Sequence, residues 1–303
     1  MTAGSAFALL CAALIGVVHV HHAPSHDTEA PFEDVLAGAR AAGLDFVVLT
    51  EHMDDAAESG PLPASEHAGL HAEGGQRPVL VLVGVEIGTR DGHLLALDVP
   101  RIPVRGGTSG REAIAAIHAL RGFAVVPHPF SHGGWHDWDA DFDGLEVHNN
   151  SEAFRSLGAK LPFAVLGSLV DREAALRGML RRPAQALERW EQLLVKRRVI
   201  GFSGADSHQN VSLLGVQLDP YAAMFGAVQT VCPDTPREER ALWSALREGR
   251  CFIRYGIHSR VSASRLEVSF PSGRREIWIH GGRDVVEIHQ PARREAPAIR
   301  GAP

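Results

Sequence analysis

The sequence has few cysteines, only Cys11, Cys232 and Cys251, and they are widely spaced with no CxxC pair. This scarcity suggests neither a disulfide framework nor a thiolate zinc site. A GxSxG elbow is also missing, and no cysteine is paired with a histidine at a strand end, so a serine or cysteine nucleophile is not indicated. Any metal chemistry must therefore come from histidine and carboxylate side chains.

Runs of lysine or arginine are absent as well, and the formal net charge is -6. The sequence therefore has no basic stripe that could follow a phosphate backbone. This charge balance predicts that nucleic acid is not a partner.

A basic segment is also missing ahead of the apolar N-terminal stretch at residues 3–18. An export signal needs such a segment, and the stretch is short for a bilayer span. It leads directly into an HVH motif, which favours a lead-in (residues 1–16) to a buried first strand. We expect a cytoplasmic protein, with membrane contact only through this segment; export and N-terminal anchoring are the alternatives.

The chain has 303 residues, 45% of them hydrophobic, which suffices for one large domain and a small appendage. Seven apolar runs are each long enough for a buried strand, and most are separated by segments with helical spacing. The runs are IGVVHVH, FVVLTEH, VLVLVGVEI, HLLALDV, FAVVPHP, GLEVHN and VIGFSGADSH, and helices are expected at residues 31–43, 111–121, 166–180, 183–197 and 236–248. Parallel crossovers between these runs predict an α/β fold with a closed or nearly closed seven-stranded, TIM-like (β/α)7 barrel.

The pattern changes from about residue 259. The segments SRLEVSF, REIWIHGG and DVVEIHQ alternate between apolar and polar residues, which predicts a small antiparallel β unit at residues 259–290. The charged, Pro- and Ala-rich tail at residues 291–303 is expected to be disordered.

Histidine, in contrast, is abundant, with 17 residues, and much of it falls in short clusters that follow the apolar runs. Each run ends in, or in one case begins with, a metal-capable side chain, and the strand ends of a parallel barrel meet around one mouth. These side chains are His19 and His21, Glu51 and His52, Glu86, His93, His128, Glu146, and Asp206 with His208. His19 and His21 are two apart on a strand, so they share a face and can bind one ion.

The simpler interpretation of any single strand-end histidine is a hydrogen-bonded structural residue. Taken together, the groups argue otherwise, because buried ionised side chains at seven strand ends would be costly without partners. A carboxylate such as Glu86 can bridge two cations and hold them at about 3.5 to 4 Å. Imidazoles with a few carboxylates suit zinc, iron or manganese.

These motifs also carry a family resemblance. The opening HVHHAPSHDTEAPFEDVLAGARAAGLDFVVLTEH, followed in order by GVEI, GHLLAL, VPHP, GLEVHN and GADSH, resembles the polymerase and histidinol phosphatase (PHP) superfamily over residues 17–208. The segment before GADSH, with YAAMFGAVQTV and ALWSALREGRCFI after it, is similar to the carbaryl-hydrolase-like metallohydrolase branch and extends the match to about residue 253. The resemblance implies a PHP fold, a distorted seven-stranded barrel, over residues 17–258.

The resemblance also implies two or three divalent metal ions, zinc, manganese or iron. One site would use His19, His21, Glu86 and Asp206, a second Glu86, His93 and His128, and a third His26, His52 and His208. The superfamily often has aspartate where this chain has His26, and aspartate where it has Glu51. The Gly-Asp that usually precedes the first motif is replaced by Val17 and Val18.

Candidate substrate residues lie nearby in the sequence. His132 and His136 belong to the loop PFSHGGWHDWDAD directly after His128, where they could line a pocket or simply form a solvated surface. Arg155 and Arg254 could each clamp an anion with a bidentate fork, although a surface salt bridge is the simpler role for both.

We therefore expect a metal-dependent hydrolase in which a metal-bridging hydroxide, held by Glu86 with His128 and Asp206, attacks phosphorus or a carbonyl carbon. The favoured substrate is a small phosphate monoester or diester. A carboxylic ester or carbamate is the alternative, and a non-catalytic metal or ligand sensor is an alternative of another class. The expected partner is thus a small-molecule ester.

Overall fold

A computed structural model describes residues 13–53, 60–155, 183–213, 215–256, 265–280 and 284–291. The expected helix at residues 166–180, most of the N-terminal lead-in and nearly all of the expected disordered tail lie outside these residues.

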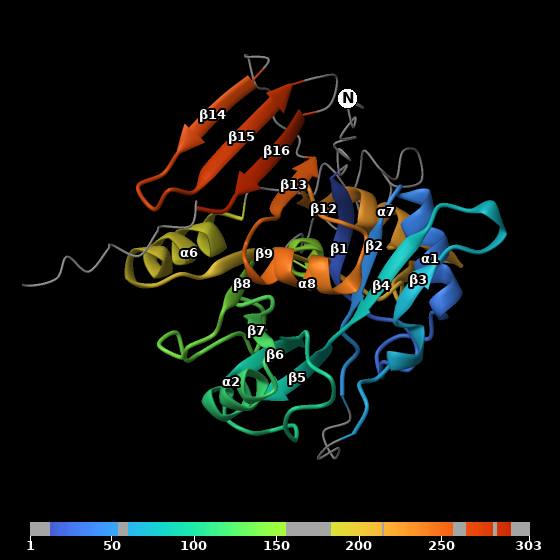
Figure 1. Ribbon diagram of the computed structural model, residues 1–303, viewed down its shortest axis with the longest axis horizontal. Helices are drawn as coiled ribbons and strands as arrows, with labels where there is room; N and C mark the ends of the chain where they lie inside the picture. Colours follow the sequence, from blue (N-terminus) through green and yellow to red (C-terminus); the bar gives the residue numbers. More distant parts are fainter. Residues whose placement is uncertain are drawn as a thin grey trace, which may run out of the picture.

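The described chain alternates strands and helices before it ends in consecutive strands (Figure 1). The strands are β1 (Leu14–Val20), β2 (Phe46–Leu49), β3 (Gly69–His71), β4 (Val79–Val83), β5 (Val85–Thr89), β6 (Gly92–Leu97), β7 (Phe123–Val126), β8 (Gly144–Asn149), β9 (Ile200–Ser207), β10 (Ser212–Leu213), β11 (Val216–Gln217), β12 (Val228–Cys232), β13 (Phe252–Gly256), β14 (Arg265–Ser269), β15 (Arg275–His280) and β16 (Asp284–His289). The helices are α1 (Phe32–Ala41), α2 (Gly110–Ala119), α3 (Asn150–Arg155), α6 (Ala184–Lys196), α7 (Tyr221–Ala227) and α8 (Glu239–Arg247), with short 3-10 turns η1 (Ser65–His67) and η2 (Glu73–Gly75).

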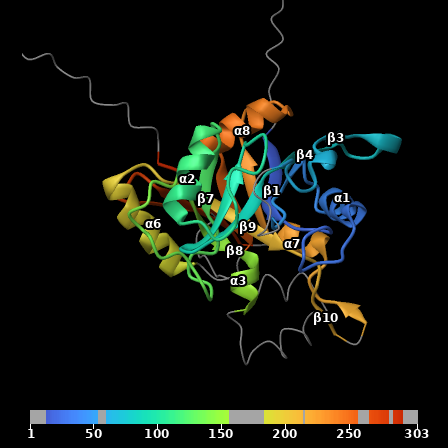
Figure 2. The ribbon, with the colours of Figure 1, turned by 90° about the horizontal axis from the view of Figure 1, so that it is seen from below.

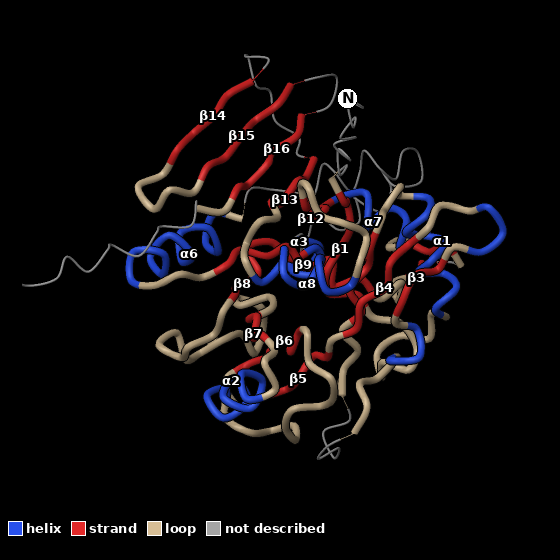
Figure 3. The backbone as a smooth tube through the Cα atoms, viewed as in Figure 1, coloured by secondary structure: helices blue, strands red, loops and turns tan. Residues whose placement is uncertain are grey.

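Four of the expected helices are confirmed, namely α1, α2, α6 and α8, and the local sequence explains their limits. Helix α2 starts at a capping box, in which the Ser109 side chain accepts from the backbone N–H of Glu112 and the Glu112 carboxylate accepts from that of Ser109. Helix α1 packs closely on α7 because Gly38 has no side chain; a Cβ there would lie 2.5 Å from the Cβ of Tyr221. Figure 3 shows α1, α2 and α6 on the outside of the strands.

In the described part of the chain, fourteen of the sixteen strands form one sheet that branches at β1, which pairs with β2, β9 and β12. The other two, β10 and β11, pair antiparallel with each other. The pairs β1–β2, β2–β4, β7–β8, β8–β9 and β1–β9 are parallel. Around these strands the order runs β2–β1–β9–β8–β7–β6–β5.

The expected closed seven-stranded barrel is not confirmed, because the sheet is not closed by strand pairing. Strand β4 pairs with β2 on one side of the sheet, and β5 is the last strand on the other side. A closed barrel would require β4 and β5 to pair, but they are consecutive segments separated only by Gly84 and do not pair with each other. The expected parallel crossovers are also wrong for β5, β6 and β7, which pair antiparallel. Only a tight turn separates β5 from β6, and a parallel connection needs a dozen residues or more.

Apolar side chains are buried on both faces of the central strands and form two clusters. One cluster contains the first residues of parallel strands, such as Phe46 and Phe123, together with Leu242 and Trp243 of α8. Helix α8 therefore covers the end of the sheet where the parallel strands begin. Figure 2 shows α8 on one side of the strands, and α3 and β10, which follow the carboxyl ends of β8 and β9, on the opposite side.

The C-terminal strands β14, β15 and β16 are antiparallel, as the alternating pattern predicts, and they continue the main sheet through β13 (Figure 1). Two contacts attach them further. The side-chain amide of Gln290 exchanges hydrogen bonds with the backbone of Gly201 in β9, at 2.6 and 3.0 Å. The buried guanidinium of Arg274 pairs with Glu191 of α6 and with Glu276, both at 2.5 Å.

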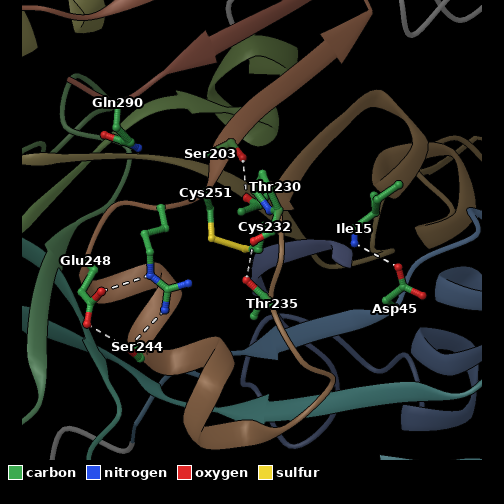
Figure 4. The surroundings of a disulfide bond; sticks show 12 residues. Ile15, Asp45, Ser203, Thr230, Cys232, Thr235, Ser244, Glu248, Cys251 and Gln290 are labelled. Carbon is green, nitrogen blue, oxygen red and sulfur yellow. Dashed lines mark hydrogen bonds and ion pairs between the residues drawn. A yellow bond between two sulfur atoms is a disulfide. The ribbon is translucent and has the colours of Figure 1, made fainter. Parts of the chain in front are cut away.

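Cys232 and Cys251 form a disulfide, which corrects the expectation that the cysteines do not pair (Figure 4). Their Cα atoms are 4.2 Å apart because Val231 and Phe252, the adjacent residues, are paired in the β12–β13 ladder. The 19-residue separation in sequence includes α8, so only the folded hairpin shows that the two thiols are neighbours. Within the described part of the chain, no helix is long and apolar enough to cross a membrane.

Candidate metal centre

The candidate ligands lie where the parallel strands end. His19 is near the end of β1, His52 follows β2, His128 follows β7, and Asp206 is near the end of β9. His93 lies near the start of β6, and the antiparallel direction of that strand brings it to the same end. The predicted convergence of strand-end side chains is therefore present, although β6 runs antiparallel to both of its neighbours.

The backbone is strained at several of these residues. His19, His128 and Asp206 have positive φ angles of 67°, 27° and 45°. The pairing register of β1 shifts between Val18 and Val20, on both sides of the strand. Left-handed backbone at residues other than glycine costs free energy and concentrates at functional sites.

Glu86 is the hub of the cluster. Its Oε2 lies 2.9 Å from His19 Nε2 and 3.2 Å from His21 Nε2. Its Oε1 lies 2.6 Å from His93 Nδ1 and 3.0 Å from His128 Nε2. The carboxylate is buried, and each of its oxygens faces a different pair of imidazoles. This is the arrangement expected of a carboxylate that bridges two cations.

A second group of imidazoles, those of His21, His52 and His208, lies beside Glu86. The ring of His21 stacks on His52 and on His208, with centroid distances of 4.6 and 4.3 Å. Asp27 Oδ2 lies 2.8 Å from His208 Nε2 and 3.4 Å from His52 Nε2. Asp27 therefore provides the carboxylate of this group.

Four combinations of these side chains have ligand atoms within 4.8 Å of one another and could hold a metal ion. They are His19/His21/Asp206, His19/Glu86/His128, His52/Glu86/His93 and His21/His52/His208. They border a cleft of about 800 Å³ that is also lined by Pro24, His26, Asp27, Met53, Gly88, Ser131, His132 and Gly133.

The charges of the cluster are tightly coupled. Burial alone would raise the pKa of Glu86, but the charge of His19 and the hydrogen bonds of His128 and other imidazoles hold that pKa well below its usual range. Burial also disfavours charge on His128, yet the hydrogen bond and charge of Glu86 raise its pKa to about 9. Burial lowers the pKa of His21 to about 3. His21 is thus held neutral, the form in which imidazole binds metal.

The ligand groups differ in part from those that the family resemblance implied. The structure places Asp27 Oδ2 within 3.4 Å of both His52 and His208, whereas the His26 ring packs beside His52 with a centroid distance of 4.8 Å. His26 is exposed at the rim of the cleft and is outside the four combinations. His21 joins the His52 and His208 group as well as the His19 group, because it lies between them.

The candidate substrate residues are spread more widely. His132 lines the cleft, whereas His136 is not among the lining residues. The Nε and Nη2 atoms of Arg254 donate to Glu287 Oε1 at 3.2 and 3.1 Å, across the β13–β16 ladder. The side chain of Arg155 lies outside the described part of the structure.

Two carboxylates of this region had no assigned role from sequence. Asp27 follows His26 directly, so a reading of the sequence that allowed a shift of one position from the expected His26 would have found it. Glu146 belongs to the sixth apolar run, lies within β8 and is buried, with Oε1 2.7 Å from His19 Nδ1. Its place in that run was visible in the sequence, but its contact with His19 was not.

No protein-family model matches the chain, and no curated protein is similar enough to match it. Solved structures match it at low sequence identity, among them the two that follow. The first is a two-domain protein containing a predicted PHP-like metal-dependent phosphoesterase from Bacteroides vulgatus, with 16% identity and a TM-score of 0.48 over 92% of this chain and 87% of that chain. The second is Endonuclease Q in complex with a 27-mer DNA duplex, with 13% identity and a TM-score of 0.43 over 78% of this chain and only 57% of that chain.

The description of the first structure names the PHP family that the sequence motifs also resemble. The carbaryl-hydrolase-like branch is not shown by either structure. The expected partner, a small-molecule ester with nucleic acid excluded, is corrected by the second structure, whose duplex substrate has an abasic lesion at the active site.

Proposed function

We propose that the protein is a metal-dependent phosphoesterase that hydrolyses a phosphate ester in the histidine-lined cleft. One observation carries this proposal: nine histidine and carboxylate side chains meet at one end of the sheet with their ligand atoms facing one another. These are His19, His21, Asp27, His52, Glu86, His93, His128, Asp206 and His208.

The donor set fits divalent cations. His21 Nε2, His208 Nε2 and Asp27 Oδ1 are buried without satisfying hydrogen bonds within the protein. Buried polar atoms are costly when unpaired, and a cation would satisfy all three. Imidazole nitrogens with a few carboxylate oxygens are the ligands of zinc, manganese or iron sites, so two or three such ions fit.

The protein side chains would divide the work by position. Glu86 would hold cations on both of its sides, and Asp206 and His128 would complete the groups around His19. Bound cations lower the pKa of water and neutralise the negative charge that develops on phosphoryl oxygens. Asp27 would hold His52 and His208 with their rings stacked on His21.

The open side of the cleft would bind the phosphate ester. Ser131 and His132 follow His128 on one loop and line this opening. Ser131 Oγ lies 3.2 Å from His128 Nδ1, which fixes the loop to the cluster. Their hydroxyl and imidazole groups can hydrogen-bond to phosphate oxygens that do not react.

The test is hydrolysis by purified protein loaded in turn with Zn²⁺, Mn²⁺ or Fe²⁺. The substrates are an aryl phosphate monoester, an aryl phosphodiester, duplex DNA with and without an abasic site, and an aryl carboxylic ester. We expect metal-dependent release of product from at least one phosphate ester, and its loss with EDTA. Turnover of the carboxylic ester alone would overturn the phosphoesterase proposal, and metal binding without turnover of any substrate would favour a sensor.

A further inference from the structure

Glu146 lies behind the candidate metal centre, on the side of His19 away from the cleft. Its carboxylate is buried, and its Oε1 is 2.7 Å from His19 Nδ1. The other ring nitrogen, His19 Nε2, faces Glu86 Oε2 at 2.9 Å and Asp206 Oδ1 at 3.6 Å. Glu146 therefore holds the ring with its Nε2 directed at the ligand group.

The second oxygen of Glu146 contacts another candidate ligand. Oε2 accepts a hydrogen bond from the backbone N–H of His128 at 2.9 Å and another from Asn149 Nδ2 at 2.9 Å. Both His19 and His128 have positive φ angles. A single carboxylate thus fixes two ligands whose backbone conformations are unfavourable by themselves.

The sheet is built to leave room for this carboxylate. Gly204 of β9 pairs with Val18 and Asn149, and a Cβ at this position would lie 2.1 Å from Glu146 Oε1. Any side chain at Gly204 would displace the carboxylate from His19.

We propose that Glu146 is a positioning residue for the metal centre, which orients His19 and His128 and thereby raises metal affinity. This inference rests on one part of the proposed function, the presence of a metal site, and does not depend on which reaction the site catalyses. Outer carboxylates that accept from the distal N–H of a ligating histidine fix its tautomer, and their loss typically weakens metal binding by about 10- to 100-fold.

Glu146→Gln is the sharpest variant, because it keeps the shape and removes only one acceptor. Three donors face the carboxylate, from His19, His128 and Asn149. The single oxygen of a glutamine can serve only one side, and its NH₂ group then meets another donor. Asp143→Asn is the matched control, because Asp143 also accepts from a histidine, His118 at 2.8 Å, and from a backbone N–H, but is not among the cleft-lining residues.

The measurement is Zn²⁺ affinity by competition with a chelating dye, in the absence of substrate. We expect affinity to fall about 10- to 100-fold in Glu146→Gln and also in Gly204→Ala, with Asp143→Asn unchanged. Wild-type affinity in Glu146→Gln would overturn the proposal. Suppose that the wild-type protein binds zinc, that Glu146→Gln binds it more weakly and that neither protein hydrolyses a phosphate ester. The proposed function then fails, but the role of Glu146 stands. If the wild-type protein binds no zinc, the proposed function and the role of Glu146 both fail.

A measurement on the wild-type chain keeps the proposal testable if the variants do not fold. Imidazole ¹⁵N spectra of the zinc-loaded protein should show His19 with a proton on Nδ1 and with Nε2 bound to the metal. A His19 ring that binds zinc through Nδ1 would contradict the proposal.

Discussion

Asp27 Oδ2 lies 2.8 Å from His208 Nε2, although the residue before Asp27, His26, was the expected ligand. Burial by itself would raise the pKa of Asp27, but the neighbouring imidazoles of His208 and His52 hold that pKa well below its usual range. Asp27 is therefore ionised at neutral pH. The Asp27 carboxylate therefore lies charged beside the three imidazoles of His21, His52 and His208.

Replacing Asp27 with alanine should remove the ion held by this group. The same change at His26 should leave the metal content unaltered, because His26 is exposed and outside the ligand combinations. Metal content after dialysis, measured by inductively coupled plasma mass spectrometry, would compare the two variants. A loss of metal from the His26 variant and not from the Asp27 variant would restore the ligand set implied by the family resemblance.

Replacing Glu86 with alanine should have a wider effect. Glu86 contacts five imidazoles, those of His19, His21, His93 and His128 within 3.2 Å and that of His52 at 3.7 Å. We expect the variant to lose more than one ion per chain and more than about 100-fold in turnover, beyond the effect typical of outer carboxylates. Metal content and initial rates would test this. A fully active Glu86→Ala protein would show that Glu86 is not a ligand of the metal centre.

The metal-free protein should lose stability as the pH rises. The pKa of His128 is raised from 6.5 to about 9, so the folded state holds this proton more tightly than the unfolded state. Its stabilising effect is complete below about pH 6.5 and disappears as the pH rises through about 9. Thermal melts in EDTA between pH 7 and 10 should show a falling Tm.

His128→Gln is the matched variant for these melts, because it cannot carry the charge. Its Tm should change less over the same pH range. Parallel curves for the two proteins would contradict this role of His128.

The Cys232–Cys251 disulfide should be found in protein that has matured under oxidising conditions. It closes a loop with a sequence separation of 19 residues, for which the chain-entropy model gives about 3 kcal/mol of stabilisation. Non-reducing peptide mapping should identify the cross-link, and Cys232→Ser with Cys251→Ser should lower the free energy of unfolding by an amount of this order. Two free thiols in protein purified without reductant would contradict the pairing.

The sequence predicted the elements better than their connections. The apolar runs located the central strands, and the spacing and caps located α1, α2, α6 and α8. The sequence did not predict the antiparallel pairing of β5 and β6. Their apolar runs have the pattern of parallel strands, because a strand that is buried on both faces shows no sign of its direction in the sequence. Direction is set by the tight turn at Gly92 and by pairing with β7, which depends on residues far apart in the chain.

The sequence by itself determined that histidines and carboxylates gather at strand ends, because residue type and strand position are local properties. Only the tertiary structure decided which of them meet. Asp27 instead of His26 reaches His208, Glu146 supports His19 from behind, and Cys251 lies opposite Cys232. Each of these contacts depends on the direction in which a side chain leaves a turn, a bulge or a strand, and backbone geometry of that kind is fixed only when the whole sheet has formed.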